Sequence, residues 1–435
     1  MGFVAVVLLI IGLIHLYLWK RLVRDPLRPG WGRRVGTALI VLFALSVPVT
    51  LIGVRNGHFQ WLSWPGYLWI AVMFYLLVTL AVLELPRLAA VLLWANRGRT
   101  PKEAQPATAA SSAAPAGTSE AGLSKARLNE AVPVGPASDI SDADGTSRSI
   151  AEAEPGDAKT DEGINRRLLL ARGTAIFAGL TAASVTGYGV KTATGAPQID
   201  RVQIPLAKLP RAMDGTRLAV VSDIHIGPLT GVNHARRIVQ VINSVDADLV
   251  CVVGDLVDGS VAELGEFAAP LAGIESRRGA FFVTGNHEYY SGHEQWIDEV
   301  ARLGLRPLRN ERLEIEGLDL AGVNDLNGEE HGDAPDFARA LGDRDPSRPV
   351  VLMAHQPVAA KEAAPFGVDL QISGHTHGGQ MVPFNFLVKL QQPVVSGFGE
   401  VDGVPVYVTN GAGFWGPPVR VGAPPQVTVI ELRTA

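Results

Sequence analysis

Three long apolar runs near the amino terminus constrain this chain more than any other feature. Residues 2–19, 35–54 and 66–83 are almost continuously apolar. A helix of about 20 such residues crosses a bilayer core of roughly 30 Å. We therefore predict a membrane region over residues 1–97 with three transmembrane helices. A cleaved signal peptide is the rival interpretation, but the first run lacks a preceding basic segment and a following small-residue cleavage site.

Basic residues between the runs predict the orientation of this region. The loop between the second and third runs has Arg55 as its only lysine or arginine. The loop between the first two runs carries Lys20, Arg21, Arg24, Arg28, Arg33 and Arg34. Because cytoplasmic loops are enriched in lysine and arginine, the first loop is expected in the cytoplasm, and so is the end of the third helix.

The next two segments differ sharply in composition. Residues 98–165 consist mainly of Ala, Ser, Pro, Gly and acidic residues, which cannot bury enough apolar surface to fold, so we predict a disordered linker. Residues 166–192 begin with Arg166 and Arg167 and continue into a small-residue apolar stretch. This segment is either a fourth transmembrane helix or an internal twin-arginine-like signal anchor. Both interpretations place the rest of the chain on the outer face of the membrane. A third interpretation, a buried helix of the next domain, does not place it there.

Strands and helices alternate from residue 216 onward. Strands are expected at 217–221, 249–253, 281–283, 350–353 and 368–373, and helices at 234–245, 264–274 and 294–303. Runs of Val, Leu and Ile without polar alternation are typical of sheets covered on both faces, which predicts an α/β fold. Short late strands at 406–408 and 427–430 indicate a second sheet, so residues 198–435 are expected to form a layered sandwich.

Metal-binding types of side chain follow five of these strands. They are Asp223 and His225, Asp255 and Asp258, Asn286 and His287, His355, and finally His375 and His377. Open α/β sheets bind ligands at the carboxyl ends of their strands. Any one of these groups alone is more often a turn or a helix cap, but five at the same topological position predict a metal centre. Glycines frame the last pair in Gly374–Gln380 and allow a sharp turn and a close approach to a ligand.

This series resembles the calcineurin-like metallophosphoesterase family, whose motifs are Asp-x-His, Gly-Asp-x-x-Asp, Gly-Asn-His-Asp/Glu, His and Gly-His-x-His. The resemblance covers roughly residues 218–432 and implies a four-layer αββα sandwich with two divalent metal ions. It assigns Asp223, His225 and His377 to one ion. It assigns Asn286, His355 and His375 to the other, with Asp255 bridging the two. Mixed nitrogen and oxygen ligands leave Mn, Fe, Zn and Mg open.

The resemblance also implies a reaction. Two such ions lower the pKa of a bridging water, so that hydroxide can attack phosphorus in line. His287 is then the candidate that stabilises or protonates the leaving oxygen. Asp258 either orients His287 or, like Glu288, is an acidic residue at the start of a helix. The expected activity is that of a phosphodiesterase or phosphatase, and the alternative is a non-catalytic membrane sensor or scaffold that only binds metal.

Within the family, this chain is similar to a bacterial membrane-associated branch. Three features carry this similarity, namely the membrane segments, the stretch Gly374–Gln380 and the tail Gly411–Arg420. That branch includes twin-arginine-exported phosphoesterases and enzymes that cleave the pyrophosphate of UDP-diacylglucosamine. An apolar segment at 381–398, together with Phe414 and Trp415, is either ordinary loop packing or an entrance that faces the bilayer. An entrance would admit a lipid-linked phosphodiester or pyrophosphate.

The net charge bears on which partners are expected, and the cysteine content bears on where the single cysteine lies. The net charge is −5 and no basic stripe is interleaved with aromatic residues, so a nucleic-acid partner is not expected. The single cysteine, Cys251, lies in an apolar run and is expected in the core. We expect a multi-pass cell-membrane protein with its catalytic domain on the outer face.

Overall fold

The computed structural model describes residues 2–54, 58–97 and 158–435. Four of its helices are long and apolar, and we call them membrane-type helices: α1 (Gly2–Leu18), α2 (Trp31–Pro48), α3 (Ser63–Arg97) and α4 (Ala158–Thr194). Helix α1 continues as a π-helical segment at Trp19–Arg24, and α2 continues in the same way at Val49–Val54. Four segments, at 4–24, 31–54, 60–86 and 168–194, are long and apolar enough to cross a membrane. They coincide with the four apolar stretches of the sequence.

The linker expected at 98–165 lies outside the described residues up to position 157. Helix α4 begins at Ala158, which is earlier than the expected start at residue 166. The described residues up to Leu83 and from Arg167 onward form one compact unit. The end of α3 from Glu84 and the start of α4 up to Arg166 belong to a second unit.

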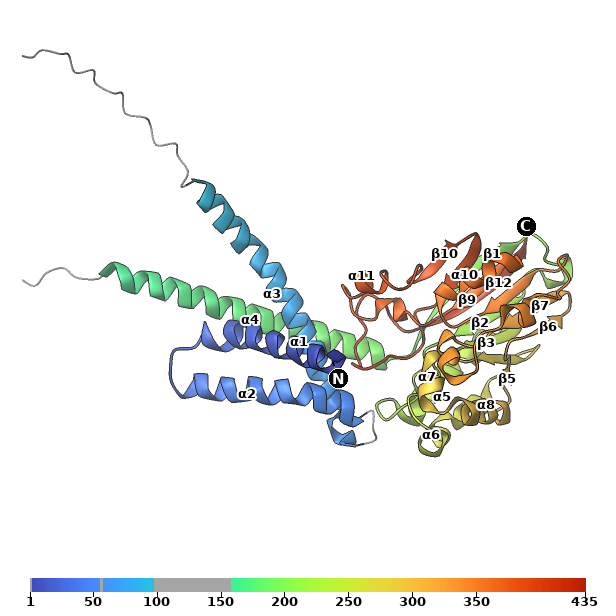
Figure 1. Ribbon diagram of the computed structural model, residues 1–435, viewed down its shortest axis with the longest axis horizontal. Coiled ribbons are helices and arrows are strands. Elements are labelled where there is room, and N and C mark those ends of the chain that lie inside the picture. The colour runs from blue at the N-terminus through green and yellow to red at the C-terminus, as the bar shows by residue number, and fades with distance from the viewer. Residues whose placement is uncertain (1, 55–57, 98–157) are drawn as a thin grey trace, which may run out of the picture. The chain divides into compact units, whose positions relative to one another are not determined.

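The chain from Gln198 onward builds two six-stranded sheets, visible in Figure 1. The first sheet has the order β1 (Gln198–Leu206), β12 (Gln426–Thr434), β2 (Arg217–Val221), β3 (Leu249–Val253), β4 (Ala280–Val283) and β5 (Arg306–Pro307). The second has the order β10 (Gly397–Val401), β11 (Val404–Val408), β9 (Leu370–Ser373), β8 (Val350–Met353), β7 (Leu318–Gly322) and β6 (Glu311–Ile315).

Alternate side chains of the strands enter two different cores. Leu218 and Val220 of β2 point into the core between the two sheets, which also contains Cys251, as expected. Ala219 and Val221 point the other way, into a core shared with α5 (Gly231–Asn243), α6 (Val261–Ala268) and α8 (His293–Arg302). The outer face of the second sheet packs on α9 (Phe337–Leu341) and α10 (Ala360–Ala363). The predicted four-layer αββα sandwich is confirmed.

Strand direction brings the motifs together. Strands β2, β3 and β4 are mutually parallel, and so are β8 and β9. Their carboxyl ends therefore open onto the same region, and the loops that follow Val221, Val253, Val283, Met353 and Ser373 meet there. The short helix α7 (Asn286–Ser291) starts directly in this region.

Candidate metal centre

The backbone of the motif loops adopts a left-handed conformation that residues other than glycine rarely adopt. Five residues have left-handed φ values, which are 52° at Asp223, 49° at His225, 53° at Asp255, 69° at His375 and 52° at His377. Such a conformation costs about 1–3 kcal/mol per residue and persists only where the surroundings impose it. Backbone hydrogen bonds between loops do so here, since Asp223 donates to the Gly254 carbonyl at 3.0 Å and His225 to the Asp255 carbonyl at 3.1 Å.

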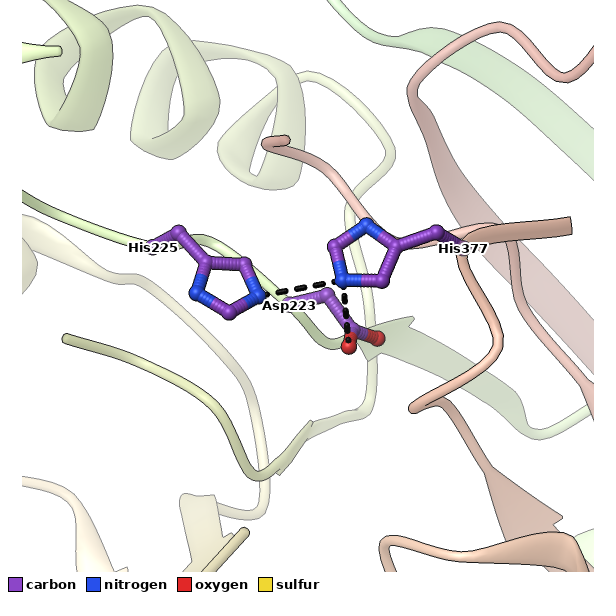
Figure 2. Close-up of side chains that lie close together, drawn as sticks. All are labelled: Asp223, His225 and His377. Atoms are coloured by element: carbon purple, nitrogen blue, oxygen red, sulfur yellow. Dashed lines mark hydrogen bonds and ion pairs between the residues drawn. The ribbon is translucent and has the colours of Figure 1, made fainter. Parts of the chain in front are cut away.

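One group of donor atoms comes from Asp223, His225 and His377, as Figure 2 shows. Nε2 of His225 lies 3.1 Å from Nε2 of His377, and Nε2 of His377 lies 3.3 Å from Oδ1 of Asp223. The Asp223 carboxylate is fully buried and accepts the backbone N–H of His375. Three lone-pair donors from two distant loops thus converge on one point.

A second group comes from Asn286, His355 and His375. Oδ1 of Asn286 lies 3.0 Å from Nδ1 of His375 and 3.2 Å from Nε2 of His355. The two ring nitrogens lie 3.3 Å apart. The other ring nitrogen of His355 lies 2.8 Å from the carbonyl oxygen of Val253, which fixes the ring and directs Nε2 into the group.

Asp255 lies between the two groups. Its Oδ2 is 3.2 Å from Nε2 of His355 and 3.8 Å from Nε2 of His225. The residues expected to ligate metal therefore lie close together, with Asp255 between the two groups.

The protonation of three of these residues fits the binding of divalent cations. Burial, and after it the neighbouring His355, lowers the pKa of His375 to about 3. Burial and then Arg420 hold the pKa of His377 well below its usual value. Burial raises the pKa of a carboxyl, but the charge of His355 holds the pKa of Asp255 well below its usual range. Neutral imidazoles and an ionised carboxylate are the forms that bind metal, so His375, His377 and Asp255 have the required form. Burial lowers the pKa of His355, but the charge of Asp255 holds it well above its usual value, so a bound ion would have to displace that proton. The mixed N and O set suits Mn, Fe, Zn or Mg.

His287 stands beside the donor groups and is oriented by Asp258. Oδ1 of Asp258 lies 2.6 Å from Nδ1 of His287 and 2.8 Å from Nδ1 of His225. Partial burial alone would lower the pKa of His287, but the charges of Asp255 and Asp258 raise it to about 9. A pKa of about 9 favours the protonated form of His287 at neutral pH, and Nδ1 of its ring faces Asp258. The hydrogen bond agrees with the interpretation of Asp258 as an orienting residue.

The role of Glu288 exceeds what the sequence indicated. Its fully buried carboxylate accepts backbone N–H groups from Gly285 at 2.6 Å, Asp255 at 2.9 Å and Leu256 at 2.7 Å. It therefore caps α7 and also ties two motif loops together. The spacing Gly285-x-x-Glu288 identifies the cap, whereas the partners in the other loop are set only by the fold.

Gln380 attaches a second loop to the centre. Its side chain accepts the backbone N–H of Trp415 at 3.0 Å and donates to the Trp415 carbonyl at 2.9 Å. The indole ring lies 6.2 Å from the His287 ring and is 56% exposed. Phe414, by contrast, is buried, with its ring 6.2 Å from that of His234, so of the two interpretations loop packing, and not an entrance, applies to Phe414.

Known proteins are similar to this chain in sequence. A model of the calcineurin-like phosphoesterase family matches residues 216–379. A metallophosphoesterase of Aquifex aeolicus is 33% identical over 243 residues, which are 54% of this chain and 92% of the relative. This chain belongs to the calcineurin-like metallophosphoesterase family.

Other members of the metallophosphoesterase family carry additional sequence. A zebrafish transmembrane protein with a metallophosphoesterase domain is 36% identical over 274 residues, which are 60% of this chain and 63% of that protein. A metallophosphoesterase of Helicobacter pylori is 38% identical over 241 residues, or 54% of this chain and 64% of that protein. The chain thus spans less than two thirds of these two relatives. Together with the four apolar helices, the similarity to a transmembrane protein supports a membrane location.

Proposed function

We propose that this protein is a membrane-anchored phosphoester hydrolase whose centre holds two divalent metal ions. The observation that carries the proposal is the position of Asp255, whose carboxylate lies within 4 Å of a ring nitrogen from each of the two donor groups. A carboxylate has two oxygens and can serve both ions. Asp223, His225 and His377 would hold one ion, and Asn286, His355 and His375 the other.

Each part of the centre has a chemical task in this proposal. Two bound ions would supply an activated water for in-line attack and neutralise charge on the phosphoryl oxygens. His287 would donate its proton from Nε2 to the leaving oxygen, which is typically worth about 10²- to 10⁴-fold in rate. Asp258 would keep His287 in the donating orientation through its 2.6 Å contact with Nδ1.

Hydrolysis of two simple esters tests the activity. The full-length protein in detergent would be stripped of metal, supplied with Mn²⁺ and assayed on bis-p-nitrophenyl phosphate and p-nitrophenyl phosphate. We expect Mn²⁺-dependent turnover that Asp255→Asn abolishes and that Asp298→Asn, an exposed change on α8, leaves intact. The ratio of the two rates distinguishes a diesterase from a monoesterase. A folded protein that binds metal and hydrolyses neither ester nor a lipid ester would favour the non-catalytic sensor or scaffold.

An apolar surface next to the centre supports a lipid-linked phosphodiester or pyrophosphate as the substrate. Large apolar side chains are exposed around the short helix α11 (Asn385–Val388), with Phe386 at 65% and Leu390 at 83%. The Phe384 ring lies 6.5 Å from Phe74 of the membrane-type helix α3. Trp415, beside His287, lies on the loop that Gln380 holds to the metal-binding segment. An apolar chain would thus find contacts from a membrane helix up to the leaving-group side of the centre.

Two variants separate lipid recognition from chemistry. We expect Phe386→Ala combined with Leu390→Ala to lower kcat/KM on a diacyl phosphodiester in mixed micelles by at least about 10-fold, since each removes several methylene-sized contacts. The rate on bis-p-nitrophenyl phosphate should stay unchanged. Ile199→Ala, an exposed apolar change on β1, is the matched control. Equal losses on both substrates would contradict an apolar entrance.

A further inference from the structure

Arg420 is a buried cation beside the metal centre that the proposed reaction does not use. Its side chain is fully buried. It donates hydrogen bonds to the carbonyl oxygens of His377 at 2.8 Å, Ala423 at 3.2 Å and Gly413 at 2.9 Å. Burial lowers its pKa to about 10, so it remains charged at neutral pH. A buried charge costs free energy unless its hydrogen bonds are made, and these partners satisfy the guanidinium mainly through backbone carbonyls.

The guanidinium also contacts the ring of His377. A terminal nitrogen of Arg420 lies 3.1 Å from Nδ1 of His377, while Nε2 of the same ring faces Asp223 and His225. With contacts to both the ring and the carbonyl of His377, the planar guanidinium restrains this residue at two points. His377 has a left-handed φ of 52°, so its backbone conformation depends on such restraint.

The backbone of Arg420 contacts the membrane-type helix α4. Its N–H donates to the carbonyl of Gly189 at 3.0 Å. Val419 is fully buried in a cluster with Ala178 and Ala182 of α4. A side chain at Gly189 would overlap Val419 and would come within 2.9 Å of Val421, so only glycine permits this approach. One residue therefore joins helix α4 to a candidate metal ligand.

We propose that Arg420 is a positioning residue through which the packing of α4 controls the metal-binding geometry of His377. The inference rests on the proposed metal centre. When α4 lies against residues 419–421, Arg420 holds His377 toward Asp223 and His225. When α4 moves away, the restraint relaxes and this site loses affinity, whereas the site of His355 and His375 does not. The membrane region would then regulate the enzyme as well as anchor it.

Metal titration of the full-length protein in lipid nanodiscs tests the coupling. Gly189→Leu should weaken one of two Mn²⁺ sites by about 10- to 100-fold, as expected when a ligand loses an orienting contact, and leave the other unchanged. Gly187→Leu is the matched control, because a Cβ at this exposed glycine of the same helix would meet no atom of the described residues within 4 Å. Arg420→Lys, which keeps the charge but not the planar fork, should reproduce the effect with α4 untouched.

The possible results are distinct. Two sites of wild-type affinity in both Gly189→Leu and Arg420→Lys would overturn the inference. An equal loss at both sites with a lower unfolding temperature would also overturn it, because Arg420 would then serve stability alone. If Arg420→Lys does not fold, Gly189→Leu decides by itself. Wild-type protein that binds two Mn²⁺ without hydrolysing any ester would contradict the proposed function but not the coupling.

Discussion

At the scale of single residues, the proposed metal ligands combine a strained backbone conformation with buried or half-buried side chains. Five proposed ligands have left-handed φ values, and the loops that impose this conformation are held by interloop contacts such as those of Glu288. These contacts fix the donor atoms before any ligand arrives. Such preorganisation is what tight metal binding and efficient phosphoryl transfer require.

His287 should matter most for esters with poor leaving groups. We expect His287→Ala to lower kcat by about 10²- to 10⁴-fold on an alkyl phosphodiester, because the alkoxide needs a proton as it departs. The loss should be much smaller on bis-p-nitrophenyl phosphate, whose leaving group departs without one. Mn²⁺ affinity should stay at the wild-type value, since the proposal assigns His287 to neither ion. An equal loss on both esters would contradict the role of proton donor.

His234 should make the fold sensitive to acid. It is buried, with Nε2 at 3.1 Å from the carbonyl of Ile224, and burial lowers its pKa to about 4. In the unfolded chain its pKa is near 6.5, so protons bind the unfolded state more strongly. The stabilisation by neutral His234 is complete above pH 6.5 and is lost as the pH falls toward 4.

This loss can be measured against a variant. Between pH 7.5 and pH 5 the free energy of unfolding should fall by ~2 kcal/mol because of His234. His234→Gln should remove this share of the pH dependence, as followed by the unfolding temperature from near-UV circular dichroism. A variant with the same pH dependence as the wild type would contradict the assignment.

At the scale of elements, close packing between loops explains why certain glycines are required. Gly285 has a φ of −105°, which any residue can adopt, but a Cβ there would overlap the Asp255 carboxylate. The loop after β4 therefore approaches the loop after β3 only because this side chain is missing.

Replacing glycine by alanine should disrupt the loop after β4 but stabilise helix α6. Gly285→Ala should separate the two loops and abolish high-affinity Mn²⁺ binding. Gly265→Ala in α6 meets only ordinary contacts, at 3.5 Å with Val261 and 3.9 Å with Glu299, and should stabilise the fold by about 0.5–1 kcal/mol. Calorimetric Mn²⁺ titration and the unfolding temperature of each variant measure both effects. Normal Mn²⁺ binding by Gly285→Ala would contradict this account of the loops.

The elements also show where local sequence information is insufficient. The apolar run predicts strand β3 with its observed bounds, because all its residues are buried. The helix expected at 264–274 instead ends at Ala268 and continues as a 3₁₀ turn that contains Pro270. No pattern in the sequence predicts strand β1, since it is largely exposed and depends on pairing with β12 at the other end of the domain.

At the scale of the whole molecule, the proposed orientation places residues 198–435, the proposed hydrolase domain, on the outer face of the membrane. Alkaline phosphatase folds only outside the bacterial cytoplasm, so it reports the side directly. We expect activity from a fusion after Ala435 and none from a fusion after Gly30, in the basic loop between α1 and α2. The opposite pattern would contradict the topology and would make a cytoplasmic lipid substrate the better candidate.

Local sequence is enough to identify the strand-end motifs, the apolar helices and the donor residues, because apolar runs and motif spacing act over a few residues. Tertiary packing was needed to show that Asp255 lies between two donor groups, that Glu288 joins two loops and that Phe414 is buried. It also brought Arg420 to His377 and Gly189, across 43 and 231 residues of chain. Such contacts arise between distant segments, which no local pattern of residues encodes.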